Sequence, residues 1–235
     1  MAKTSALPKF VQLSEMLIRE IAAGHLSDGA RLPPERDMAD DLGVAVGTLR
    51  KALADVEAKG LLDRVQGSGN YVRHRPAVDS VYAFFRLELL KGGGLPTAGV
   101  LTVDRLAKPE SFAALGGDGQ GHRIRRLRFL DGVMIALEEI WLDGAIRDRI
   151  DVSDLSDSLY HFYRHDLGIV IASVEDRIGV ARVPEWAPEA FHLSPGAAVG
   201  YIERVSWTAT KEPAEFSRTW YDAERANYIS RMGKG

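Results

Sequence analysis

The chain has 235 residues, of which 46% are hydrophobic and 27% are charged, a composition typical of a globular protein with one large or two small domains. It has no cysteine, which excludes disulfides and thiolate metal sites. It also has no apolar run of the roughly 18–20 residues that a membrane helix needs. Because the N-terminus lacks the apolar core of a signal peptide, we expect a cytoplasmic protein without membrane contact.

Three helices are predicted before Gly60. The first has an apolar stripe whose members recur every three or four positions: Phe10, Leu13, Leu17 and Ile21. The second begins at Pro34, because proline suits the first position of a helix, and ends at Gly43. The third covers residues 45–59 and has four apolar residues on one face: Leu49, Ala52, Leu53 and Val56. The last two helices, joined by a short turn around Gly43, form a helix-turn-helix.

A β-hairpin is predicted directly after the third helix. Its two extended runs, residues 61–66 and 70–73, flank a tip of three small residues: Gly67, Ser68 and Gly69. The stretch from Arg64 to Arg75 contains no acidic residue and is a local basic patch on a chain whose net charge is -3. A linker is predicted over residues 76–80, so we expect one domain over residues 1–75 and a second over residues 81–235.

The second domain is predicted to be α+β with a mainly antiparallel sheet. Its expected strands cover residues 81–90, 100–106, 122–130, 133–141, 169–183, 199–209 and 214–221. Its expected helices cover residues 155–165 and 184–193.

The outward face of the third helix is short, polar and cationic. Gly47 and Lys51 lie opposite the apolar face, flanked by Thr48 and Arg50. Such a face can enter the major groove of DNA, where arginine or lysine reads guanine and threonine contacts a phosphate or a thymine methyl. Glycines at position 47 and at the hairpin tip allow the backbone to approach the duplex closely. Arg36, near the start of the second helix, is placed to bind the DNA backbone.

A series of motifs in this first domain resembles the GntR family of bacterial regulators. They are LPPERDMA (32–39), LGVA (42–45), TLRKAL (48–53), GLL (60–62) and GSGNYV (67–72). The resemblance implies a winged helix-turn-helix that contacts DNA through Arg36, Thr48, Arg50 and the wing glycines. The family usually has a serine at the position of Ala45 and a DNA-contacting arginine at the position of Val46. We therefore expect an operator that differs from the common family sequence.

Fragments of the second domain resemble the UTRA domain of the HutC branch of that family. They are YAFF (82–85), RLRFLDG (126–132), ALEE (136–139), SLY (158–160) and EFSR (215–218). The resemblance implies a chorismate-lyase-like fold that binds small molecules without converting them. We assign the effector site to eight residues: Phe85, Arg126, Arg128, Glu138, Ser158, Tyr160, Glu215 and Tyr221.

Arg126 and Arg128 are two positions apart in a predicted strand, so they share one face. Two guanidinium groups on one face attract a phosphate or a carboxylate, which predicts an effector such as a sugar phosphate, a phosphonate or a carboxylate. Alternatively, the two arginines form salt bridges with Glu138 or Glu139 across a hairpin, and Ser158 caps a helix. We expect no cofactor and no metal, since His161 and His165 have no further ligand nearby in the sequence.

These features predict a homodimeric, ligand-responsive repressor that binds an inverted repeat in double-stranded DNA. The homodimer is expected from the family and from the pairing of half-sites. One alternative is a chorismate-lyase-like enzyme domain fused to a DNA-binding module, which turnover of a bound carboxylate would reveal. Another is an interaction protein whose helical hairpin binds a second protein, which salt-sensitive binding to a short palindrome would reject.

Overall fold

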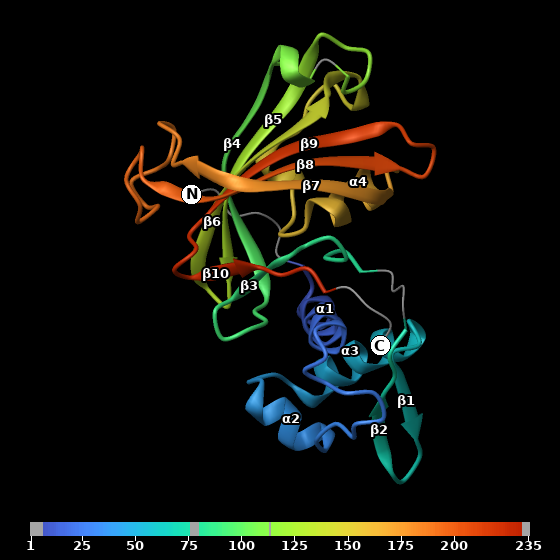
Figure 1. Cartoon of the computed structure of the whole chain (residues 1–235). Helices are drawn as coiled ribbons and strands as arrows, with labels where there is room; N and C mark the ends of the chain where they lie inside the picture. Colours follow the sequence, from blue (N-terminus) through green and yellow to red (C-terminus); the bar gives the residue numbers. More distant parts are fainter. Residues whose placement is uncertain (1–6, 76–79, 113, 232–235) are drawn as a thin grey trace. The chain divides into compact units, whose positions relative to one another are not determined.

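The computed structural model describes residues 7–75, 80–112 and 114–231, which form two compact units (Figure 1). The helical unit contains the described residues of Leu7–Arg86, together with Gly92–Leu95 and residues 229–231. The sheet unit contains Leu87–Lys91 and the described residues of Pro96–Tyr228. Most of the predicted linker, residues 76–79, lies outside the described residues, and Ser80 belongs to the helical unit.

The helical unit is a winged helix-turn-helix. It consists of α1 (Lys9–Ala22), α2 (Glu35–Asp41), α3 (Val46–Ala58) and an antiparallel hairpin, the wing, of β1 (Leu62–Val65) and β2 (Gly69–Val72). The predicted apolar faces meet in one core: Leu17, Ile18, Ile21, Leu32, Ala39, Leu49, Leu53, Val56, Leu61, Leu62 and Val72. Gly43 and Gly60, which follow α2 and α3, have φ values of 60° and 73°, a left-handed backbone that only glycine adopts at little cost.

The sheet unit is built on a six-stranded antiparallel sheet with the order β4-β5-β6-β9-β8-β7. The strands are β4 (Pro96–Ala107), β5 (Gln120–Leu130), β6 (Val133–Asp143), β7 (Ile171–Arg182), β8 (Ala198–Thr208) and β9 (Pro213–Tyr221). A separate two-stranded sheet pairs β3 (Leu87–Leu89) with β10 (Ala226–Tyr228). Three short 3-10 helices cover Glu110–Phe112, Gly144–Ile146 and Val152–Asp154.

The two faces of the large sheet are covered by different elements. Helix α4 (Leu159–Asp166) lies against one face (Figure 1), where Phe162 and Tyr163 pack with Ile124 and Ile140 of the sheet. The loop between β7 and β8 lies on the other face, where Phe191 packs with Leu127, Leu137 and Trp220. The α4 face is therefore a distinct layer in which side chains from the helix and from several strands meet.

Two predicted elements are wrong. Residues 184–193 form turns instead of a helix, because Pro188 has no N–H to donate and disfavours a helical Ala187 before it. Residues 81–90 contain only the short strand β3, preceded by turns in which Ala83 and Phe85 donate to the carbonyls of Ser80 and Tyr82.

The helix predicted from residue 155 begins later, at Leu159, after the capping residue Ser158. No helix among the described residues is long and apolar enough to cross a membrane.

Candidate functional site

The outward face of α3 is exposed, as the sequence predicts. Arg50 and Lys51 are exposed and Thr48 is half-buried, whereas the four apolar residues of the opposite face have no exposed surface. Arg36 on α2 is also exposed. Among the described residues, neither Arg36 nor Lys51 has a hydrogen-bond or ion-pair partner in the protein, so both cations are available to an external anion.

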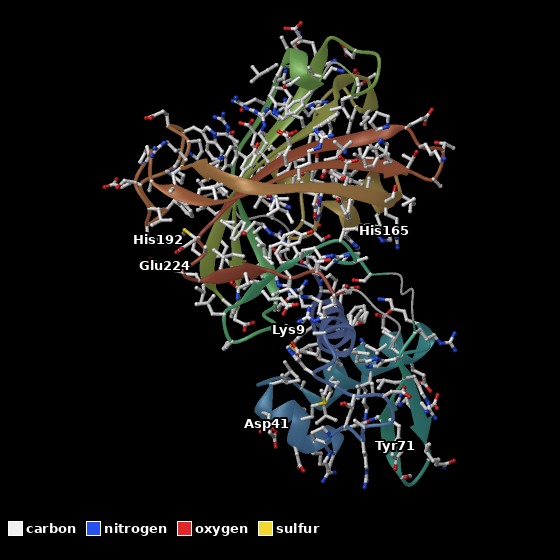
Figure 2. All side chains as sticks on the ribbon, in the orientation of Figure 1. Lys9, Asp41, Tyr71, His165, His192 and Glu224 are labelled. Carbon is white, nitrogen blue, oxygen red and sulfur yellow. The ribbon has the colours of Figure 1, made fainter. Side chains whose placement is uncertain are left out.

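The wing presents its glycine tip to solvent beside the start of α2. Gly67 and Gly69 have φ values of 75° and 138°, and the amide of Ser68 donates to the carbonyl of Val65 at 2.9 Å. The hydroxyl of Tyr71, labelled in Figure 2, lies 2.6 Å from that of Ser68. This tight tip brings backbone close to any duplex that lies against it.

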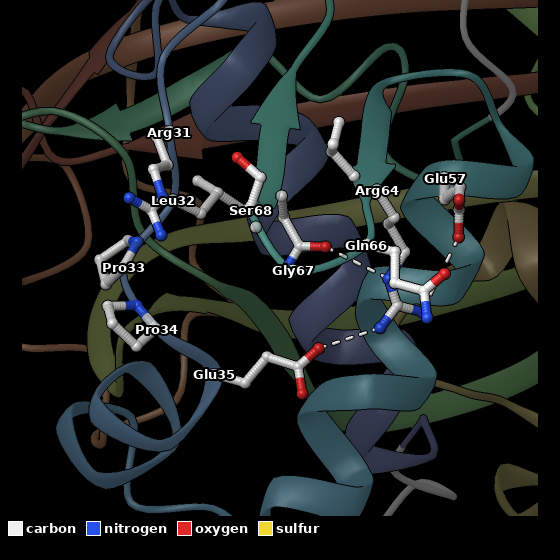
Figure 3. Close-up of a pocket in the computed structure, with 13 residues that line it drawn as sticks. Arg31, Leu32, Pro33, Pro34, Glu35, Glu57, Arg64, Gln66, Gly67 and Ser68 are labelled. Atoms are coloured by element: carbon white, nitrogen blue, oxygen red, sulfur yellow. Dashed lines mark hydrogen bonds and ion pairs between the residues drawn. The ribbon is translucent and has the colours of Figure 1, made fainter.

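A hollow of about 610 Å³ separates the wing from the segment before α2 (Figure 3). It is lined by Arg31, Leu32, Pro33, Pro34, Glu35, Glu57, Arg64, Val65, Gln66, Gly67, Ser68, Gly69 and Asn70. Arg31 lies so close to the tip that a Cβ atom on Gly69 would be 3.0 Å from its Nε atom. Arg31 is thus a cation at the wing that sequence reasoning missed, because only the β-bridge between Arg31 and Tyr71 brings the two segments together.

Arg50 is paired with an acidic residue of α2. Its Nε atom donates to Oε2 of Glu35 at 2.6 Å, and Nη2 of Arg64 donates to Oε1 of the same carboxylate at 2.9 Å. The hydrogen bond from Arg50 and the charges of both arginines lower the pKa of Glu35. The carboxylate therefore stays ionised between α3 and the wing.

A second group of predicted site residues meets on the α4 face of the sheet. Strand register puts Arg126 of β5 opposite Glu138 of β6. On β8 and β9 it puts Ser206 opposite Glu215. Tyr163 of α4 reaches this layer, because its hydroxyl donates to Oε2 of Glu215 at 2.6 Å. Helix α4 and the strands β5, β6, β8 and β9 thus contribute polar side chains to one buried layer.

The two predicted arginines of β5 are both buried and have different partners. The Nε atom of Arg126 donates to Oε2 of Glu138, which is the salt bridge that the sequence offered as an alternative. Nη1 of Arg128 donates to the carbonyl of Asp157 at 2.8 Å, and its Nε lies 3.7 Å from Oε1 of Glu138. Among the described residues, the buried Nη1 atom of Arg126 has no hydrogen-bond partner. An unsatisfied cationic donor in a dry site is costly.

Glu215 lies at the centre of a hydroxyl network. Besides Tyr163, the hydroxyls of Ser206 and Ser217 each donate to its Oε1 atom at 3.2 Å. Burial raises the pKa of Glu215, and burial together with the charge of Glu215 raises the pKa of Tyr163. The layer therefore holds neutral hydroxyls that can bind polar groups of a ligand.

Three further predicted residues of this site lie at the start of α4 and at the end of β9. The Ser158 side chain accepts from the amide of His161 at 3.4 Å and so caps α4, and the Tyr160 hydroxyl lies 3.0 Å from that of Ser206. Tyr221 packs over Gly200, where a Cβ atom would meet its ring.

Phe85 lies outside the sheet unit. It belongs to the helical unit, where the guanidinium of Arg19 lies 5.0 Å from its ring centroid.

Sequence reasoning missed several polar residues of the α4 face. Arg204 donates to both carboxylate oxygens of Asp176, at 2.6 and 2.7 Å, and the Tyr228 hydroxyl donates to the same carboxylate at 2.7 Å. Arg204 and Ser206 are two positions apart in β8, so the alternation of a strand places them on one face. That signal does not say which face is turned toward α4, because this depends on the register with β9. No group of three or more metal-ligating side chains occurs in the described part of the chain.

Two family models match separate parts of the sequence. The sequence matches the family model "Bacterial regulatory proteins, gntR family" over residues 10–72 and the UTRA domain model over residues 92–227. It is 55% identical to the HTH-type transcriptional regulator SmoD of Agrobacterium fabrum, over 97% of each chain. It is 23% identical to the HTH-type transcriptional repressor NagR of Bacillus subtilis, over 99% of this chain and 98% of that one.

A solved structure shares the fold. The crystal structure of YydK from Bacillus subtilis superposes with a TM-score of 0.55 at 23% identity, covering 97% of this chain and 100% of that one. At this identity the likeness concerns the fold alone.

Proposed function

This chain belongs to the GntR family of bacterial regulatory proteins and carries a UTRA domain, and on that premise we propose that it is a repressor that a small anionic effector releases from its operator. The chain is a DNA-binding transcriptional regulator, as the relatives that match nearly its whole length are. One observation carries the proposal of an anionic effector: Arg126 is buried in the UTRA domain with a hydrogen-bonding nitrogen left over.

On DNA, we assign the reading of bases to α3. Arg50 contacts guanine, Thr48 contacts a phosphate or a thymine methyl, and Gly47 lets the helix approach the groove. Arg36 and Lys51 neutralise phosphates, since both are exposed cations without a protein partner in the described part of the chain. The wing tip, Gly67 to Gly69 with Ser68 between them, lies against the backbone or the minor groove. Two copies of the chain bind the two halves of an inverted repeat.

In the UTRA domain, we place the effector against the polar layer of the α4 face. The charged group of the effector binds Arg126 and Arg128, as guanidinium groups bind phosphate, phosphonate or carboxylate oxygens. Its hydroxyl or amino groups bind Glu138, Tyr160 and Glu215, and the capped start of α4 at Ser158 adds backbone donors. Tyr221 forms part of the wall. We do not assign Phe85 to this site, because its ring already packs against the guanidinium of Arg19 at 5.0 Å.

Release from the operator requires that the effector bind two domain arrangements with different affinity. A ligand that binds both equally shifts nothing, however tightly it binds. We propose that the arrangement favoured by the effector separates the two DNA-binding domains from their half-sites. The UTRA domain binds the effector without converting it, so the ligand is recovered unchanged.

The effector proposal is tested by fluorescence anisotropy with the full chain and an operator duplex selected from a random-sequence library. Inorganic phosphate, hexose phosphates, phosphonates and small carboxylates are added in turn, and a true effector releases the duplex and raises the melting temperature of the protein. Mass spectrometry of the recovered ligand separates binding from turnover.

The matched variants for this test are Arg126→Lys and Arg177→Lys. The first keeps a cation beside Glu138 but removes the Nη1 donor, which has no hydrogen-bond partner among the described residues. We expect the effector concentration needed for release to rise roughly tenfold, because one charge-assisted hydrogen bond to the effector is lost. The second changes an arginine whose side chain is 73% exposed on β7 and leaves the response unchanged. Equal responses of Arg126→Lys and the unmodified chain contradict the assigned site.

A further inference from the structure

The carboxylate of Glu35 joins three elements of the helical unit, and Figure 3 shows its contact with Arg64. Glu35 is the first residue of α2, Arg50 lies on α3 and Arg64 lies on β1 of the wing. Each oxygen serves one arginine: Oε2 accepts from Arg50 at 2.6 Å and Oε1 accepts from Arg64 at 2.9 Å. One acidic side chain thus ties α3 to the wing.

Arg64 is held by protein groups at all three of its nitrogens. Nη2 donates to Glu35, Nε donates to Oδ1 of Asn70 at 3.2 Å, and Nη1 lies 3.8 Å from Oε2 of Glu57. Asn70 belongs to β2 and Glu57 to α3. Through two hydrogen bonds and one longer ion pair, Arg64 braces the wing against α2 and α3.

Arg50 is held at one nitrogen only. Its Nε atom binds Glu35, and among the described residues its two terminal amino groups have no protein partner. Its side chain remains 62% exposed. These two amino groups are the pair that can donate to O6 and N7 of a guanine, and a held Nε leaves fewer rotamers to be ordered when that contact forms.

We propose that Glu35 is a positioning residue for base recognition: it holds the Nε atom of Arg50 so that the terminal amino groups face the major groove, and through Arg64 it fixes the wing relative to α3. Glu35 raises specificity and not general affinity. Its negative charge repels phosphates and lowers affinity for every sequence alike, whereas its hold on Arg50 favours only the sequence that Arg50 reads. This inference rests on the proposed contact of Arg50 with a base.

The experiment compares four variants of the full chain: Glu35→Gln, Asp37→Asn, Arg50→Ala and the double variant Glu35→Gln/Arg50→Ala. The amide introduced by Glu35→Gln keeps one acceptor oxygen but has a donor in place of the other, so it cannot hold both arginines. Asp37 is a matched control, because it is also an acidic residue in the first turn of α2 and is exposed. The measured quantity is the ratio of dissociation constants for a scrambled duplex and for the duplex that the unmodified chain selects from a random library.

We expect Glu35→Gln to lower this ratio roughly tenfold, within the range that one arginine–guanine contact contributes. Binding to the scrambled duplex stays equal or becomes tighter, because a negative charge is lost. Asp37→Asn keeps the ratio within about twofold, because it removes a charge that holds no arginine. In the double variant, Glu35→Gln adds no further loss to that of Arg50→Ala, since Glu35 acts through Arg50.

A Glu35→Gln ratio equal to that of the unmodified chain overturns the inference, and so does an additional loss in the Arg50→Ala background, which shows a general structural effect. If Arg50→Ala itself leaves the ratio unchanged, the proposed base contact fails and the inference fails with it. Melting temperatures are measured for all variants. Should Glu35→Gln prove unstable, Arg64→Gln gives the second test, since loosening the wing brace then lowers the same ratio without altering α2.

Discussion

Each unit of this regulator contains an arginine–glutamate pair, and the two pairs differ in their surroundings. The side chains of Arg50 and Glu35 are 62% and 21% exposed, whereas those of Arg126 and Glu138 are 8% and 11% exposed. Water screens the first pair, and the terminal amino groups of its arginine remain accessible while Nε is held by Glu35. The second pair is desolvated, so removing one partner leaves a buried charge. The same pair of residue types is therefore screened by water in one unit and desolvated in the other.

The largest expected effect comes from breaking the buried pair. Arg126→Ala removes the hydrogen-bonded partner of the buried Glu138 carboxylate and leaves it only the longer ion pair with Arg128. We therefore expect a loss of roughly 3 kcal/mol in the free energy of unfolding, the lower end for a broken buried pair, measured by urea denaturation. The control Arg177→Ala removes an exposed arginine that pairs with Glu175, and it changes that free energy by less than about 0.5 kcal/mol. A loss below about 1 kcal/mol for Arg126→Ala would mean that the two pairs do not differ as described.

The exposed pair is expected to behave in the opposite way. Arg50→Ala changes the free energy of unfolding by less than about 0.5 kcal/mol, but it costs roughly 1–3 kcal/mol in binding to the selected operator duplex and alters the preferred sequence. Anisotropy titrations with the selected and the scrambled duplex measure both effects. Equal losses on the two duplexes would show that Arg50 contacts only phosphate.

The acidic residues of the two units are expected to respond oppositely to pH. Burial raises the pKa of Glu215, so the stability that its protonated form contributes is present below the ordinary glutamate value of about 4.3 and is lost as pH rises through the raised pKa. The hydrogen bond from Arg50 lowers the pKa of Glu35, so its contribution is present above the ordinary value and is lost as pH falls through the lowered pKa.

This difference is measured by urea denaturation at a series of pH values. Glu215→Gln removes the titrating group, and we expect its free energy of unfolding to decline less than that of the unmodified chain as pH rises above the ordinary glutamate range. Glu212→Gln is the control, because Glu212 is exposed in the turn before Glu215. An unchanged decline in Glu215→Gln would contradict the raised pKa.

The smallest expected effect concerns an exposed cation without a protein partner in the described residues. Arg36→Ala weakens binding to the selected and the scrambled duplex by the same factor and reduces the slope of log affinity against log salt by roughly 1. Titrations at several salt concentrations measure this slope. A loss confined to the selected duplex would instead make Arg36 a base-reading residue.

The helical unit was the easier part to predict from sequence. Its apolar residues recur at helical spacing, and Gly43 and Gly60 mark the ends of α2 and α3, so local patterns suffice to place α3 with Arg50 and Lys51 outward. The wing follows from its glycines in the same way. Local patterns failed where a segment depends on distant partners: residues 81–86 form turns, and Ser80 donates to Glu15 of α1, which no periodicity reveals.

The polar layer of the UTRA domain was only partly predictable. Alternation along β5 places Arg126 and Arg128 on one face. It does not say whether they bind an anion or form salt bridges with Glu138 or Glu139. The structure shows Arg126 paired with Glu138, and it adds Tyr163 and Arg204, which lie far from β5 in the sequence. Strand register and the docking of α4 bring these residues together.

Residue order alone was sufficient for the helix-turn-helix, the glycine-tipped wing and the family, because these depend on spacings of a few residues and on the backbone freedom of glycine. The sharing of Glu35 by Arg50 and Arg64, the approach of Arg31 to the wing tip and the buried network around Glu215 became visible only after folding. The reason is physical: each joins side chains from segments far apart in the chain, and their distances are set by packing and strand register, which no local pattern encodes.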